Sequence, residues 1–174
     1  MSKTKKLAIA GILVAIGVSL SAFSIPVGAA RVFPIQHMIN VIAGVLLGPV
    51  YAITMALATS IIRNILGTGT LLAFPGSMFG ALFAGYAAIL ARRVNRSEQR
   101  ALVFACGGEL FGTGILGALA AYPIAALLMG REVALFGFVI PFSISSLGGA
   151  VFAFIILLAL KRTGVLQAAG VGAS

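Results

Sequence analysis

Charged residues are missing from long stretches of this sequence. Lys, Arg, Asp and Glu are absent from five stretches of 21 to 31 residues: Leu7–Ala30, Val32–Ile62, Asn64–Ala91, Leu110–Gly130 and Val133–Leu160. A helix needs about 20 apolar residues to cross the roughly 30 Å hydrocarbon core of a bilayer. Each stretch is therefore long enough to cross a membrane as a helix.

The composition excludes the soluble classes of protein. Hydrophobic residues make up 61% of the 174-residue chain and charged residues only 9%. A soluble domain carries about 25% charged residues. With a mean hydropathy of +1.18, a chain of this size would fold with an apolar surface. A cytosolic enzyme, a disordered protein and a secreted disulfide scaffold are excluded, and an integral membrane protein remains.

A break in the second stretch sets the expected number of crossings. Gly48-Pro49 interrupts the run from Val32 to Ile62, and such a pair ends helices. Five stretches, one of them divided, predict an all-α integral membrane protein with six transmembrane helices in a single domain over residues 1–174. The expected spans are about 7–23, 36–47, 50–66, 77–91, 101–128 and 134–160.

The distribution of positive charge predicts the orientation. Of the 12 Lys and Arg residues, nine precede the first span, lie in the middle loop or follow the last span: Lys3, Lys5, Lys6, Arg92, Arg93, Arg96, Arg100, Lys161 and Arg162. Arg31, Arg63 and Arg131 belong to the other side. Cytoplasmic loops carry the excess of Lys and Arg, so both termini are expected in the cytoplasm. The same clustering argues against nucleic-acid binding, which needs a folded basic face.

Polar side chains of several spans are expected at one level, just below the outer surface. Gln36, His37 and Asn40 open the second span, Arg63 and Asn64 end the third, and Tyr122 lies in the outer part of the fifth; Ser143, Ser145 and Ser146 lie in the outer half of the sixth. A mostly apolar cavity with a few placed polar groups is typical of a small-molecule site. Three of these residues also have a purely structural interpretation. Arg63 would extend its charged end to the membrane interface, Asn40 would hydrogen-bond only to a neighbouring helix, and Tyr122 would belong to the aromatic belt at the interface.

Glu109 is the one acidic residue inside an expected span. It follows Arg100 by nine residues, which places it about 13 Å from the inner surface if helical. A carboxylate at this depth costs about 2.5–3.5 kcal/mol on insertion scales, so it needs a partner. Pairing with Arg63, contact with a substrate, a protonation site and a neutral core carboxyl are all open.

Catalytic and cofactor signatures are missing from the sequence. One His and one Cys cannot build a four-ligand metal site, and without Asp there is no Ser-His-Asp triad. The glycine-rich runs match neither a P-loop nor a dinucleotide fingerprint. We therefore expect no catalysis, no metal and no cofactor, and we expect that the chain itself does not hydrolyse ATP.

Small residues at a four-residue spacing form a stripe on the first span: Gly11, Ala15 and Ser19. Such a stripe lets helices approach closely. It serves either internal packing or docking of another membrane subunit.

Several short motifs stand out along the chain: His37-xx-Asn40, Leu47-Gly48-Pro49, Arg63-Asn64-xx-Gly67-Thr68-Gly69, Ala73-Phe74-Pro75-Gly76-Ser77, Gly112-Thr113-Gly114 and Tyr122-Pro123. They resemble the ThiW family of substrate-binding subunits (S components) of energy-coupling-factor (ECF) vitamin transporters. Six spans in about 170 residues fit that group, and the resemblance extends from about Leu7 to Arg162.

The resemblance implies uptake of a thiamine precursor, with hydroxyethylthiazole as the expected ligand. It also implies a transmembrane coupling (T) subunit and two ATP-binding cassette ATPases as partners, with Gly11, Ala15 and Ser19 resembling the docking motif. Binding from outside under the loop between the first two spans is implied as well.

Our expectation is a binding subunit without catalysis. Its pocket lies beneath residues 24–35 and 67–75, and its expected ligand contacts are Gln36, His37, Asn40, Arg63, Asn64, Glu109 and Tyr122. The alternatives are an S component for another vitamin, a self-sufficient carrier or channel, and a membrane-embedded lipid-modifying enzyme that uses Glu109 and His37. Residue counting places those two at opposite depths, which argues against the enzyme.

Overall fold

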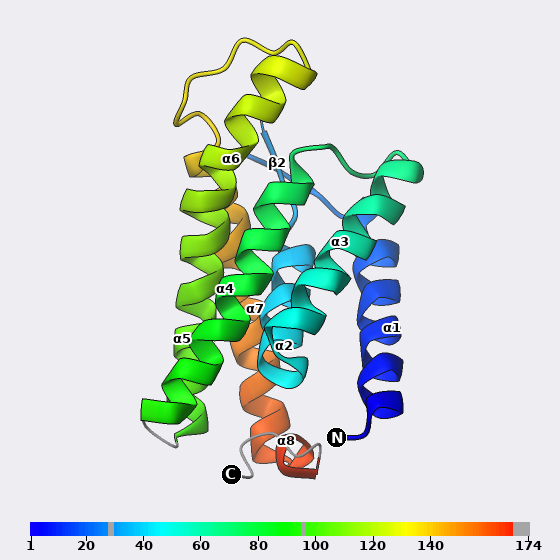
Figure 1. The fold of residues 1–174 in the computed structure, drawn as a ribbon, viewed down its shortest axis with the longest axis vertical. Helices are drawn as coiled ribbons and strands as arrows, with labels where there is room; N and C mark the ends of the chain where they lie inside the picture. The colour runs from blue at the N-terminus through cyan, green and yellow to red at the C-terminus, as the bar shows by residue number, and fades with distance from the viewer. Residues whose placement is uncertain (28–29, 95–96, 169–174) are drawn as a thin grey trace.

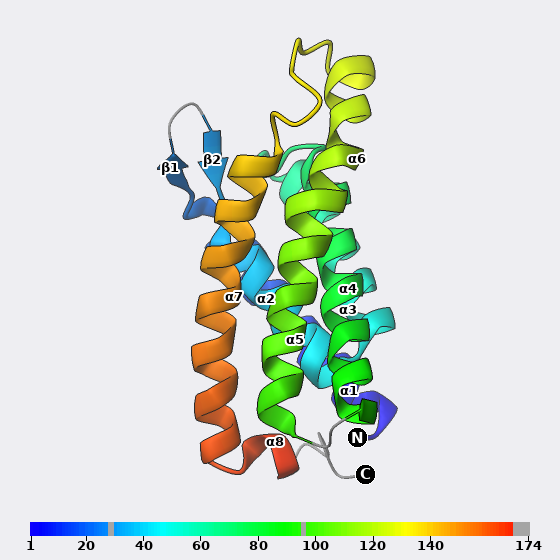
Figure 2. The same ribbon diagram turned by 90° about the vertical axis from the view of Figure 1, so that its left-hand side faces the viewer.

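The computed structural model is a bundle of helices aligned along one axis (Figures 1 and 2), and it describes residues 1–27, 30–94 and 97–168. The first half of the chain contains α1 (Lys3–Ser19), the short turn η1 (Leu20–Ala22), α2 (Pro34–Leu47) and α3 (Pro49–Ile65). The second half contains α4 (Ala73–Val94), α5 (Glu98–Phe111), η2 (Gly112–Gly117), α6 (Ala118–Pro123), η3 (Ile124–Leu128), α7 (Val139–Arg162) and α8 (Val165–Ala168).

Four of the described helical segments are long and apolar enough to cross a bilayer. They are Lys3–Ala22, Ala73–Val94, Glu98–Leu128 and Val139–Arg162, whereas α2 is a shorter apolar helix of 14 residues and α3 has 17. Glu98–Leu128 runs through α5, η2, α6 and η3 and includes two π-helical segments, η2 and η3. An all-helical membrane architecture is thus confirmed at the level of these long helices.

Helix α2 occupies the centre of the bundle. It packs against α1, α3, α4, α5 and α7, and 11 of its 14 residues are buried. Large apolar side chains of the surrounding helices point outward instead, among them Leu90, Val103 and Ile155. The core is therefore formed around α2, and the outer surface is apolar, as a lipid environment requires.

Glycines on α5 and at the start of η2 allow this part of the chain to pack backbone against backbone on α4. A Cβ built on Gly108 would lie 2.5 Å from the Phe83 carbonyl oxygen, and one on Gly112 would lie 2.5 Å from the Phe79 carbonyl oxygen. Small residues permit this approach in membrane helices. The close packing fixes α5 beside α4 along the length that carries Glu109.

Two elements differ from the sequence-based expectation. Residues 24–35 were expected as a loop between the first two spans, but within this range strands β1 (Ile25–Val27) and β2 (Ala30–Val32) pair in antiparallel fashion and are called the hairpin below. Helix α4 begins at Ala73, before Pro75 and Gly76, rather than near Ser77. Proline is accepted in the first turn of a helix because its missing N–H would have no partner there.

The termini and the hairpin mark opposite ends of the bundle. Figure 1 shows the N-terminus and helix α8 at the bottom, whereas β2 and the end of η3 lie at the top. At the bottom, Arg92 binds Glu98 through two bonds of 2.9 and 3.0 Å and also donates to the Val45 carbonyl at 3.3 Å. This contact brings the lower ends of α2, α4 and α5 to one level.

Candidate functional site

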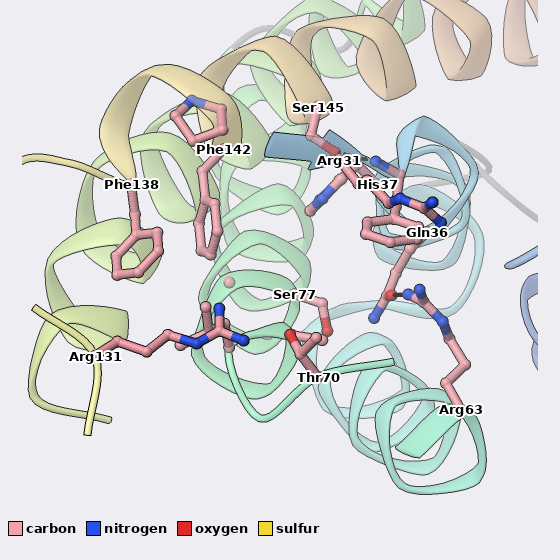
Figure 3. A pocket seen from close by; sticks show the side chains of 15 residues that line it. Arg31, Gln36, His37, Arg63, Thr70, Ser77, Arg131, Phe138, Phe142 and Ser145 are labelled. Atoms are coloured by element: carbon pink, nitrogen blue, oxygen red, sulfur yellow. Dashed lines mark hydrogen bonds between the residues drawn. The ribbon is translucent and has the colours of Figure 1, made fainter. Parts of the chain in front are cut away.

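A cavity of about 330 Å³ lies beside the β1–β2 hairpin, at the end of the bundle away from the termini. Figure 3 shows side chains from β2, α2, α3, α4 and α7 converging on it. Its lining residues are Arg31, Phe33, Gln36, His37, Arg63, Thr70, Leu72, Ala73, Gly76, Ser77, Arg131, Phe138, Pro141, Phe142 and Ser145. Its volume falls at the small end of the roughly 300–1,000 Å³ typical of ligand pockets.

Arg63 and Gln36 form one polar wall of the cavity. Arg63 is 1% exposed; it donates from Nη1 to Gln36 Oε1 and from Nη2 to the Thr68 carbonyl at 2.9 Å. Its guanidinium carbon lies 4.6 Å from the centre of the Phe33 ring, which is within cation–π distance. These contacts fix the guanidinium at the cavity wall.

The loop after α3 has a conformation that suits this arrangement. Gly67 takes a φ of +71°, which glycine adopts without steric cost. The chain therefore reverses, and the amides of Thr68 and Gly69 donate to the Arg63 carbonyl at 2.9 and 3.0 Å. The same reversal points the Thr68 carbonyl back at the Arg63 side chain.

A buried polar cluster lies directly behind His37. Its Nδ1 is 2.7 Å from Glu109 Oε1, and Asn40 Nδ2 donates to the same oxygen at 3.2 Å and to the Ser77 carbonyl at 3.1 Å. The Thr113 hydroxyl, carried by η2, lies 2.8 Å from Glu109 Oε1. Glu109 is fully buried, so α2, α4, α5 and η2 meet around one carboxylate.

This cluster corrects the depth that residue counting gave to His37 and Glu109. The count placed them at opposite depths, but they are in contact. Helix α2 is short and begins below the hairpin, so His37 lies only eight residues from Val45 at the lower end of the helix, about 12 Å. Glu109 lies eleven residues from Glu98 at the same end, about 16 Å.

The opposite wall of the cavity is aromatic and apolar. Phe138 and Phe142, at the start of α7, have ring centres 5.8 Å apart, and Leu72 and Pro141 complete this wall. Figure 3 shows the two rings facing the polar side chains across the hollow. An aromatic ring of a ligand would find stacking partners here and hydrogen-bonding groups opposite.

The comparisons with known proteins decide the family. A family model described as "Thiamine-precursor transporter protein (ThiW)" matches residues 7–163. The chain belongs to the ThiW family. No curated protein and no solved structure matches it.

Membership of this family determines the class and location of the protein. ThiW is a family of transporters, not of enzymes, so the lipid-modifying enzyme considered above is set aside. Together with the four long apolar helices, the family makes the chain a multi-pass protein of the cell membrane. No group of three or more His, Cys, Asp or Glu suited to a metal occurs within the described residues.

The structure brings some of the predicted site residues together and separates others. Gln36, His37 and Arg63 line the cavity, and Asn40 and Glu109 lie behind His37. Asn64 instead donates to the Ser60 and Thr70 carbonyls at 2.8 and 3.2 Å and so braces the loop. Tyr122 lines a separate, open hollow together with Arg131 and Glu132.

Several cavity residues were not among the predicted contacts. Arg31 and Arg131 were recognised only as outer positive charges, and Phe33, Phe138 and Phe142 have no distinctive spacing in the sequence. A combined signal was present for the arginines: two cations at the outer loops of a chain with three acidic residues have few possible partners. The aromatic residues became recognisable only once α7 and the hairpin were placed.

The predicted docking stripe lies on the outer face of the bundle. Gly11, Ala15 and Ser19 of α1 are all exposed, and a Cβ on Gly11 would meet nothing within 4 Å. The residues that α1 buries are Ala10, Leu13 and Gly17. The stripe thus faces away from the other described helices.

Proposed function

We propose that this chain is the substrate-binding subunit of an ECF-type ABC transporter that imports a thiamine precursor, hydroxyethylthiazole or a close derivative of it. The observation that carries the proposal is the cavity, which joins a wall of fixed polar groups to a wall of phenylalanines. A small heteroaromatic ring with a polar substituent fits such a site. Family membership supplies the thiamine-precursor class.

The proposed orientation is six crossings with both termini in the cytoplasm. Two observations support it: the start of α1 and helix α8 lie at one end of the bundle (Figure 1), which an even number of crossings requires, and Lys3, Arg92 and Lys161 belong to that end. The cavity then opens toward the outside, where a scarce nutrient is captured.

Within this site we assign three kinds of role. Gln36, His37 and Arg63 contact the ligand, because they line the cavity. Asn40 and Glu109 hold His37 in place through the buried cluster. Asn64 holds the loop of residues 67–72, and Tyr122, which lies in the neighbouring hollow, supports the outer ends of the helices.

The exposed stripe on α1 is the proposed docking face for the coupling subunit. Gly11, Ala15 and Ser19 offer a shallow surface on which another helix can pack closely. Two ATPases bound to the coupling subunit would supply the energy. Replacing Ala15 by Trp should prevent co-purification of the partners and leave ligand binding unchanged.

Equilibrium binding to the purified subunit tests the proposal. Radiolabelled thiazole alcohol should bind, and excess unlabelled thiamine precursor should displace it. A panel containing unrelated vitamins tests the alternative of a different S-component substrate. Binding of one of those vitamins, and of no thiamine precursor, would overturn the assignment.

A further inference from the structure

The cavity wall carries positive charge without a protein counter-charge. Arg31 comes from β2, Arg63 from α3 and Arg131 from the loop after η3, and none of the described residues that line the cavity is acidic. Within the described part of the chain, Arg31 and Arg131 form no ion pair and no hydrogen bond through their side chains. Figure 3 shows both guanidinium groups reaching toward the hollow.

The three acidic residues of the chain are placed so that they do not neutralise these cations in the cavity. Glu98 binds Arg92 at the opposite end of the bundle, and Glu109 is held by His37. Glu132 follows Arg131 in the chain and shares the neighbouring hollow with it, but Glu132 does not line the cavity, and no ion pair joins the two within the described residues. The three arginines of the cavity are therefore left for a partner that the protein itself does not supply.

An anion is the partner that this arrangement favours. Arg63 is 1% exposed and its Nε has no acceptor, and a buried guanidinium without an anion keeps an unfavourable desolvation cost. Low-dielectric walls such as the phenylalanines strengthen the field of the cations inside the hollow. Arginine also matches phosphate geometry with two parallel hydrogen bonds, which adds specificity.

We infer that the ligand of this site is an anion, a heteroaromatic ring that carries a phosphate monoester, with the phosphate between Arg31 and Arg131 and the ring against Phe138 and Phe142. The inference rests on the proposed function and deepens it. The hydroxyl of the thiazole alcohol is the position where such an ester forms. The phosphate of a lipid headgroup offers the same chemistry, and the experiment separates the two sources.

The test compares matched pairs of ligands on the full chain in maltoside micelles, which contain no phosphate. Each pair is a neutral alcohol and its phosphate monoester, one pair for the thiazole half of thiamine and one for the pyrimidine half, measured by calorimetry. We expect one ester to bind at least about tenfold more tightly than its alcohol, and its affinity to fall as salt is raised.

Three variants assign the effect to the arginines. Arg31→Gln and Arg131→Gln remove exposed, unpaired charges, so both variants should fold. Because the alcohol carries no charge, its affinity should fall by a smaller factor than that of the ester. Each should lose about tenfold in affinity for the ester. Arg93→Gln, which removes an exposed arginine at the opposite end of the bundle, is the matched control and should leave both affinities unchanged.

The remaining outcomes overturn the inference in distinguishable ways. An alcohol that binds as tightly as its ester overturns the inference and leaves the proposed function standing. If no member of either pair binds, the inference and the proposed function fail together. If phosphatidylglycerol added to the micelles displaces the ester, the arginines serve lipid headgroups, and the inference is overturned.

Discussion

At the scale of single residues, one carboxylate oxygen collects most of the polar contacts behind the cavity. His37, Asn40 and Thr113 all lie within hydrogen-bond distance of Glu109 Oε1. A buried group left without its partner costs about 1–3 kcal/mol. Removal of the Glu109 carboxylate would therefore leave several buried polar side chains without this shared partner.

Replacing Glu109 by Leu should lower the stability of the fold, because Asn40 and His37 then lose their shared acceptor. We expect a loss of about 2–4 kcal/mol, on the assumption of one to two unsatisfied groups, measured by thermal unfolding in detergent. Glu109→Gln keeps an acceptor oxygen and is the control; it should unfold close to the wild type. Equal melting temperatures for Leu and Gln would contradict the role given to this oxygen.

Arg63 acts through geometry as well as charge. A lysine at this position keeps the charge but presents a single ammonium, which cannot bind Gln36 and Thr68 while stacking on Phe33. Arg63→Lys should reduce affinity for the thiamine precursor at least about tenfold, or ~1.4 kcal/mol, in the equilibrium binding assay. Arg93→Lys is the matched control, and unchanged binding by Arg63→Lys would show that charge alone suffices.

At the scale of elements, the close packing of α4 against α5 requires glycine only on the side of α5 that faces α4. Gly108 faces the Phe83 carbonyl at 2.5 Å from a built Cβ, whereas its neighbour Gly107 faces open space. Gly108→Ala should destabilise the protein by about 1–3 kcal/mol, because the backbones must separate. Gly107→Ala should be neutral or stabilising by up to ~1 kcal/mol. Thermal unfolding of the two variants checks this, and equal effects would contradict the packing.

The same elements show what the sequence alone could predict. Helix α2 ends at Leu47 and α3 begins at Pro49, at the break that Gly48-Pro49 marks locally in the sequence. The hairpin was missed because its strands are only three residues long. The contact of His37 with Glu109 was missed because it joins residues 72 positions apart, and their relative depth depends on where α2 begins within the bundle.

In the candidate site, too, some residues could be predicted from the sequence and others could not. Gln36, His37 and Arg63 were predicted because polar groups at the ends of apolar spans are conspicuous. Tyr122 was expected with them from its depth, but depth does not tell on which side of a helix a residue lies, and it lines a different hollow. The phenylalanine wall could not be predicted, since apolar residues are everywhere in this chain.

At the scale of the whole molecule, the bundle separates its functions along its long axis. The termini and the Arg92–Glu98 pair lie at one end, and the hairpin and the cavity lie at the other. For import, the cavity end must face the outside in the unoccupied state. Orientation in the membrane is thus a property on which the entire functional proposal depends.

Single-cysteine labelling tests this orientation. Cys106, the one native cysteine, is first replaced by Ala; then Gln99→Cys places a thiol at the lower end and Leu135→Cys places one at the cavity end, both at exposed positions. A membrane-impermeant maleimide added to intact cells should label only Leu135→Cys, because positively charged segments stay in the cytoplasm. Lysed cells should label both, which controls for reactivity. Labelling of Gln99→Cys in intact cells would place the cavity in the cytoplasm, where it could not capture a nutrient from outside.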